Sequence, residues 1–120
     1  MAMPNTNSPR FHAQIDVLEE RLHETMDRLQ TGYMLKAIAE MAEVCPSVAS
    51  FDLDVDRRLE CRDAQDAEGN TVSQEVQEAL DSVFHYRDEA DYSLFVGRTV
   101  VVADVIAHWV KYGGRDRPTA

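Results

Sequence analysis

One run of apolar residues constrains the fold of this chain more than any other feature. Between positions 11 and 29, large apolar side chains recur at steps of three and four residues, the period of one face of an α-helix. Ser8 can cap the start of this helix, and Pro9 suits its first position. The apolar residues are Phe11, Ile15, Leu18, Leu22, Met26 and Leu29. We therefore expect a long amphipathic helix near the start of the chain.

The phase of this pattern breaks at Gly32. If one helix continued with the same face buried, that face would have to accept Lys36 and Glu40. The later apolar residues shift to another face instead: Met34, Leu35, Ile38, Met41 and Ala42. Because glycine commonly ends helices, the sequence predicts two helices, over 9–31 and 33–44, that form a helical hairpin.

The period changes to two between residues 47 and 70, which predicts two strands of a half-exposed sheet. In the first run apolar residues alternate with aspartates, and in the second Leu59 and Cys61 alternate with charged residues. Residues 56–58 are expected to form the turn, although no glycine is present there, and 66–70 a second loop.

The rest of the chain predicts two further helices. Thr71 and Gln74 have the spacing of a capping box, so a third helix follows them. The final segment fits two structures: a helix over 98–112, which we prefer, or a β-hairpin within 92–103 that would enlarge the sheet.

These elements predict a helix-rich α+β fold with an N-terminal helical hairpin, a small antiparallel sheet of two to four strands and two further helices. Residues 9–114 form a single acidic domain in this prediction. Residues 1–8 form a mobile arm and 115–120 a frayed tail. A compact domain of 120 residues would have a radius of gyration of roughly 14 Å.

The charge of the chain excludes several classes of partner. Asp and Glu number 22 against 12 Lys and Arg, for a net charge of -10, and residues 47–92 alone hold 13 acids and four arginines. Direct binding to nucleic acid or to an anionic membrane is disfavoured, because both require a surplus of positive charge. The chain has two cysteines and shows no secretion leader, so we expect a cytoplasmic location.

Three aspartates at alternate positions, with two later acids, have a spacing similar to that of the oxygen ligands in a calcium loop. They are Asp52, Asp54, Asp56, Glu60 and Asp63. The position that needs glycine in such a loop is Arg57 here. No nucleophile or phosphate-binding motif is present. We therefore predict no enzymatic activity, metal or cofactor. The alternative is a small metal-binding protein or enzyme that uses the carboxylates of Asp52, Asp54 and Asp56.

The acidic middle of the chain suggests a non-enzymatic module that docks on a basic surface of a partner protein and inhibits or regulates it. Inhibitors that mimic nucleic acid, immunity proteins and acidic secretion chaperones share this character. A mimic would need strand and helix acids combined, because alternate strand residues lie roughly 6.6–6.8 Å apart and duplex DNA carries a charge about every 1.7 Å. The predicted partner-binding residues are Asp52, Asp54, Asp56, Glu60, Asp63, Asp66, Glu68, Glu75, Glu78 and Asp81. The competing interpretation is that these acids only keep the chain soluble.

The apolar face of the first helix suggests a second interaction. A helical hairpin and a small sheet offer limited cover for a stripe of this length. A homodimer formed through the first helix is therefore a hypothesis. The alternative is that later elements of the same chain cover the stripe.

Overall fold

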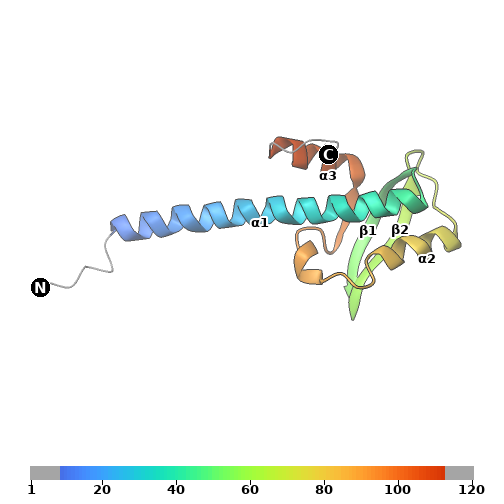
Figure 1. The fold of residues 1–120 in the computed structure, drawn as a ribbon, viewed down its shortest axis with the longest axis horizontal. Coiled ribbons are helices and arrows are strands. Elements are labelled where there is room, and N and C mark those ends of the chain that lie inside the picture. The colour runs from blue at the N-terminus through green and yellow to red at the C-terminus, as the bar shows by residue number, and fades with distance from the viewer. Residues whose placement is uncertain (1–8, 113–120) are drawn as a thin grey trace, which may run out of the picture.

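The computed structural model describes residues 9–112, and one long helix dominates it (Figure 1). The elements are α1 (Pro9–Val44), β1 (Val48–Asp56), β2 (Arg58–Asp66), α2 (Gln74–Val83), the short 3-10 helix η1 (Glu89–Tyr92), β3 (Arg98–Val101) and α3 (Val102–Lys111). The strands form one antiparallel sheet in the order β2-β1-β3. The predicted helix-rich α+β fold with a small antiparallel sheet is confirmed. The predictions of a mobile arm over 1–8 and a frayed tail over 115–120 lie outside the described residues.

The predicted helical hairpin is wrong, because α1 runs through Gly32 without a break. A Cβ atom built on Gly32 would lie 3.3 Å from Cζ3 of Trp109 in α3. The glycine therefore allows α3 to pack closely on α1. The phase shift in the sequence marks a change of the buried face, since after Gly32 the buried side chains of α1 include Met34, Ala37 and Met41.

The hydrophobic core lies between the second half of α1, α2 and one face of the sheet. Phe51 of β1, Phe84 at the end of α2 and Tyr92 of η1 pack as a chain of rings with centroids 5.7 Å apart. The other core side chains are Met34, Ala37, Ile38, Met41, Val48, Leu53, Leu59, Cys61, Ala64, Leu80, Val100 and Val105. The alternation predicted for the first two strands is confirmed, because Phe51 and Leu53 are buried and the intervening aspartates are not.

Strands β1 and β2 form the expected hairpin, with Arg57 alone at its tip. Arg57 and Asp63 both have a positive φ. This is the left-handed region of the backbone, which glycine adopts most easily. Asp63 lies where the pairing register shifts between Asp52 and Ser50 of β1. A β-bulge of this kind bends the strand and increases its twist.

The preferred helix over 98–112 is wrong in its first four residues, which form β3. The alternative, a β-hairpin within 92–103, correctly predicted that this segment enlarges the sheet. It was wrong about the pairing, because β3 pairs with β1 and Val100 lies opposite Phe51. Val100 is buried in the core. Tertiary packing of this side chain therefore outweighs the helical pattern that surrounds it in the sequence.

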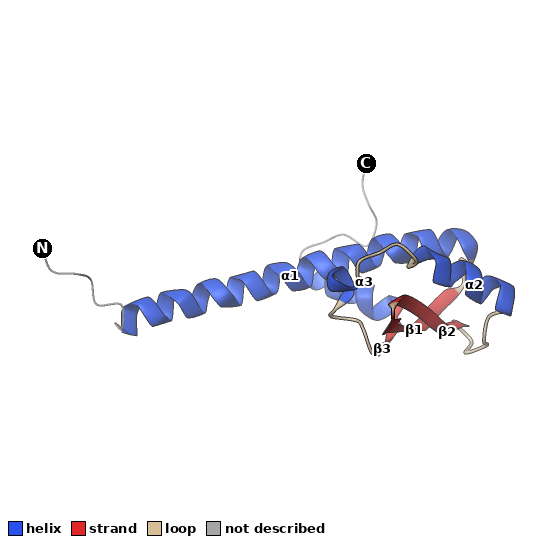
Figure 2. Ribbon diagram, turned by 90° about the horizontal axis from the view of Figure 1, so that it is seen from below, coloured by secondary structure: helices blue, strands red, loops and turns tan. Residues whose placement is uncertain are grey.

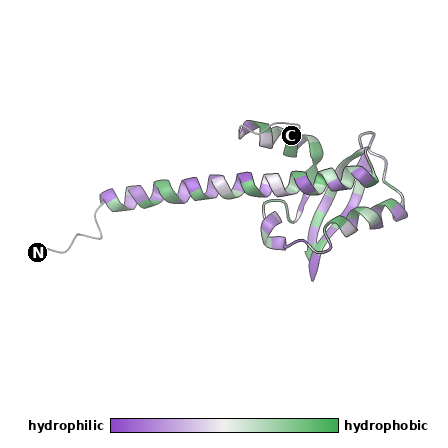
Figure 3. Ribbon diagram, viewed as in Figure 1, coloured by the Kyte–Doolittle hydropathy of each residue, from purple (hydrophilic) through white to green (hydrophobic). Residues whose placement is uncertain are grey.

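The molecule is far more extended than a compact domain of its length. The radius of gyration is 18.9 Å against the roughly 14 Å expected of a compact chain, so that prediction is wrong. The large radius of gyration results from the first part of α1, residues 9–29, which extends beyond the body of the protein (Figure 1). We call these residues the projecting segment. Apolar and polar residues are interspersed along it (Figure 3).

The packing of α3 can be tested with two identical changes in that helix. Val105→Ala should lower the free energy of unfolding by about 1–3 kcal/mol, because it removes buried methyl groups and leaves a cavity. Val110→Ala should change it by less than about 0.5 kcal/mol. Val105 is 3% exposed and Val110 is 49% exposed. Urea denaturation followed by circular dichroism measures both, and equal effects would contradict this orientation of α3.

Candidate protein-binding surfaces

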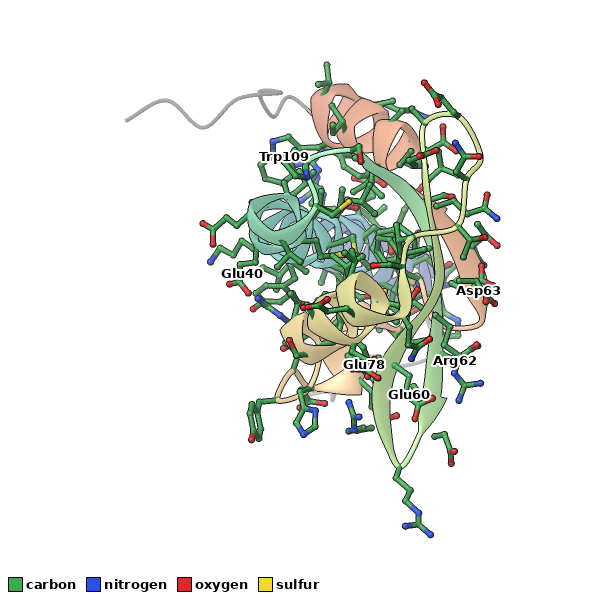
Figure 4. All side chains as sticks on the ribbon, turned by 90° about the vertical axis from the view of Figure 1, so that its right-hand side faces the viewer. Glu40, Glu60, Arg62, Asp63, Glu78 and Trp109 are labelled. Atoms are coloured by element: carbon green, nitrogen blue, oxygen red, sulfur yellow. The ribbon has the colours of Figure 1, made fainter. Side chains whose placement is uncertain are left out.

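Among the elements of residues 9–112, no helix packs over one face of the sheet. Helices α1 and α2 lie on the other side of the sheet (Figure 2). Since side chains alternate along a strand, Asp52 and Asp54 of β1 point away from the core that holds Phe51 and Leu53. Five side chains define what we call the open sheet face: Asp52, Asp54, Glu60, Arg62 and Thr99. Figure 4, viewed from the end of the molecule, shows Arg62 on the side of the sheet away from α1.

The register of the strands sets these side chains opposite one another. Asp52 lies between Arg62 of β2 and Thr99 of β3, while Asp54 lies directly opposite Glu60. Two like charges at opposite positions of neighbouring strands destabilise the pair. The sequence predicted the acids of this face but missed Thr99, because β3 was expected to be helix.

Hydrogen bonds and ion pairs occupy part of the open sheet face. The Thr99 hydroxyl donates a hydrogen bond of 2.6 Å to Asp52 Oδ1. Arg62 forms an ion pair with Glu60. The pKa of Arg62 is raised by its hydrogen bond to Glu60 and by the charge of Glu60, with smaller contributions from Asp54 and Asp56. Arg62 is therefore attracted by several carboxylates at once.

The other predicted acids lie around the body rather than on this face. Asp56 adjoins the hairpin tip, and exposed Asp63 lies at the bulge (Figure 4). Asp66 Oδ1 accepts the backbone N–H groups of Glu68 and Asn70 at 2.9 and 3.0 Å, so this carboxylate shapes the β2–α2 loop. Glu68 is exposed in that loop, and Glu75 and Glu78 are exposed on α2.

Asp81 differs from the rest because its carboxylate binds inside the protein. Its Oδ1 accepts the backbone N–H of Cys61 at 2.7 Å, and its Oδ2 lies 3.4 Å from Nη2 of Arg58. Gln77, one turn earlier, accepts the N–H of Ala64 and donates to the carbonyl oxygen of Cys61, both at 2.8 Å. Side chains of α2 therefore satisfy the backbone groups along the edge of β2, which blocks pairing with another strand.

The buried thiol of Cys61 lies beneath this edge. Burial raises the pKa of Cys61 from 9.0 to about 12, although a hydrogen bond with Gln77 opposes the shift. Nearby negative charge on Asp81 and Asp52 adds to the rise. The thiol therefore stays protonated and acts as a small apolar side chain.

The projecting segment offers a second candidate surface. Its apolar stripe consists of Phe11, Ile15, Leu18, Leu22, Met26 and Leu29, and all six side chains are exposed. The elements that pack on α1 contact its second half. Within the part of the chain that the structure describes, later elements therefore do not cover the stripe, as one alternative had proposed.

The structure offers no support for the metal alternative. Among residues 9–112, no group of three or more histidine, cysteine and acidic side chains is placed to hold a metal ion. Nor does any helix in that range combine the length and apolar character that a bilayer span needs. Asp52, Asp54 and Asp56 follow one strand rather than converging around a point.

Comparisons with known protein families, with curated proteins and with solved structures found no match. What the two surfaces do must therefore be inferred from their own residues.

The internal role of Asp81 can be separated from the role of a surface acid on the same helix. Asp81→Ala should cost about 1–3 kcal/mol of unfolding free energy, because it leaves the Cys61 N–H without its acceptor and Arg58 without its counterion. Glu78→Ala should stay within about 0.5 kcal/mol, since Glu78 is exposed. Chemical denaturation measures the free energy of unfolding of both variants. An Asp81→Ala variant as stable as the Glu78→Ala variant would refute the internal role of Asp81.

The raised pKa of Cys61 predicts a loss of stability at alkaline pH. Above pH 9 the unfolded chain releases the thiol proton, while the folded protein keeps it until about pH 12. The unfolded state then binds fewer protons, so the free energy of unfolding falls as the pH rises, by about 2 kcal/mol at pH 10.5 from this group.

Denaturation at pH 8 and pH 10.5 tests this for the wild type and for Cys61→Ala. The variant should lose less stability between the two pH values, because its other titrating groups are unchanged. Parallel losses in the two proteins would contradict the buried thiol.

Proposed function

We propose that the protein is a non-enzymatic protein-binding module that docks its open sheet face on a basic surface of a partner protein and so inhibits or regulates that partner. The observation that carries this proposal is the position of Asp54 directly opposite Glu60, on a sheet face over which none of the described helices packs. Like charges opposite each other are unfavourable in the free protein. A lysine or arginine from a partner relieves that repulsion on binding.

The only arginine on this face cannot fill that role completely. Arg62 pairs with Glu60, and its guanidinium is also attracted by Asp54 and Asp56. Glu60 and Asp54 on the open sheet face, together with Asp56 near the hairpin tip, thus share one cation. A guanidinium from a partner can bind a carboxylate through two parallel hydrogen bonds, which gives orientation as well as affinity.

The charge of the whole chain supports the same partner chemistry. A net charge of -10 attracts basic proteins over a distance of about 8 Å at physiological salt and raises the rate of encounter. The basic groove of a nucleic-acid-binding protein is one surface of this kind. Asp56 and Asp63 can extend the contact from the edge of the face, whereas Asp81 is left out because its carboxylate is bound internally.

The location of binding can be tested with an arginine-rich peptide as a defined basic probe. We expect the triple variant Asp52→Asn, Asp54→Asn, Glu60→Gln to bind the peptide about tenfold more weakly than the wild type, since three exposed ion pairs at about 0.5 kcal/mol each contribute about 1.5 kcal/mol. Fluorescence anisotropy at 50 and 300 mM NaCl measures the affinity, and binding should weaken steeply with salt.

The matched control removes the same charge from the projecting segment. Asp16→Asn, Glu20→Gln, Glu24→Gln changes three exposed acids, so it has the same net charge as the sheet variant. It should lower affinity less than about threefold, because only the long-range attraction is reduced. Equal weakening by the two triple variants would show that the peptide responds to net charge alone and would overturn the proposed docking face.

A further inference from the structure

The projecting segment keeps a regular helix while its apolar stripe lies in water. Leu18 is 61% exposed and Leu22 is 58% exposed, although both are on a helix whose second half packs one face into the core. Most helical stability in proteins comes from packing an amphipathic face, and isolated helices of this length are marginal. An exposed apolar stripe bordered by charged residues marks an interaction surface.

The stripe has the seven-residue period of a coiled coil. With the heptad positions written a to g, the a positions are Ile15, Leu22 and Leu29, and the d positions are Phe11, Leu18 and Thr25. Apolar a and d positions form the seam between two supercoiled helices. Ile15 at a with Leu18 at d is the combination that favours two parallel strands, whereas the other two a positions are Leu22 and Leu29. Met26, at an e position, borders the seam.

We infer that the projecting segments of two copies of this chain pair as a parallel, in-register coiled coil over residues 11–29. Each a or d residue then meets its own equivalent in the second copy. The partner is thus the same chain, and the interface has the two-fold symmetry of most homodimers.

The buried area is sufficient for a stable dimer. The large apolar side chains of the stripe are each 40–61% exposed, and covering six of them in both copies removes roughly 1,000 Å² of apolar surface from water, which is the lower limit for a specific interface.

The charges that flank the seam favour the parallel orientation. In a parallel pair each g position faces the e position five residues later in the other copy, so Gln14 faces Glu19 and Arg21 faces Met26. An antiparallel pair that covers the whole stripe would place Leu22 opposite Leu18. It would then set Arg21 opposite Arg21 and Glu19 opposite Glu19. The parallel pair avoids both like-charge contacts.

The coiled coil ends where the body begins. The next d position after Thr25 is Gly32, against which Trp109 packs within the same chain, and the next a position is Lys36. Two lysines facing each other would oppose further pairing. The apolar seam therefore ends at Leu29, next to the first contact with the body, where the guanidinium of Arg28 lies 5.5 Å from the centre of the Tyr112 ring.

Sedimentation equilibrium of the full chain between 1 and 500 μM tests the pairing. The wild type should approach twice the mass of one chain as its concentration rises. Leu18→Glu should weaken dimerisation by at least about tenfold, because it places a charge in the seam. Val17→Glu makes the same kind of change at an exposed residue outside the seam and should remain dimeric.

Two results would overturn the inference: a wild type that keeps the mass of one chain over the whole range, or Leu18→Glu and Val17→Glu variants with equal masses. Near-ultraviolet circular dichroism confirms that the body of each variant is folded. Neither substitution alters the open sheet face, so peptide binding by that face is measured independently of the mass.

Oxidative cross-linking tests the orientation. In a Cys45→Ser background, Leu29→Cys should form a covalent dimer, because the two sulfur atoms meet at the seam of a parallel pair. In an antiparallel pair they would lie about 27 Å apart along the axis, at about 1.5 Å per residue over 18 residues. Val17→Cys in the same background should not cross-link. A dimer that Leu29→Cys fails to cross-link would overturn the parallel arrangement.

Discussion

The continuity of α1 through Gly32 determines the rest of the structure. Its second half is fixed in the core by Met34, Ala37 and Met41, which provides the nucleus for the whole helix. Once a helix is nucleated, each further residue adds a hydrogen bond at little cost, so the helix can extend beyond the body. Glycine within a helix costs about 1 kcal/mol relative to alanine, and close packing by Trp109 offsets that cost. One rigid rod thereby joins a folded body to an uncovered apolar stripe.

The acidic residues of the body fall into two groups that differ in what their carboxylate oxygens contact. Asp81 and Asp66 accept backbone N–H groups and hold a strand edge and a loop in place. Asp54 and Glu60 instead lie opposite each other on the open sheet face, where the ion pair of Arg62 with Glu60 only partly offsets their repulsion. Net charge alone cannot distinguish these two groups, because both contribute equally to the total. Only the positions of the backbone donors separate a structural carboxylate from one that is available to a partner.

The sequence predicted those parts of the fold that depend on local pattern. The period-two alternation around Phe51 and Leu53 predicted the first two strands. A helix after Thr71 was also predicted, but its cap was wrong, because Ser73 rather than Thr71 caps α2 by accepting a hydrogen bond from the N–H of Val76. The errors arose where a distant contact overrides the local pattern. Gly32 was wrongly predicted to end a helix because its contact with Trp109, 77 residues later in the chain, leaves no mark on the local pattern. Val100 was wrongly predicted to be helical because its pairing with Phe51 of β1 is also distant in sequence. For the same reason the sequence identified Asp81 as acidic but could not show that Cys61 donates to it.

The two inferred interactions strengthen each other through geometry. A parallel coiled coil holds both bodies at the same end of the dimer, so the two open sheet faces reach a partner together. After one face binds, the second encounter is intramolecular, and two weak contacts can give an affinity roughly 10²–10⁴-fold higher than either alone. This matters for a face that relies on exposed ion pairs, each worth about 0.2–1 kcal/mol. Repulsion between two bodies of like charge opposes the arrangement, but salt screens it within about 8 Å, and a basic partner bound between them replaces it with attraction.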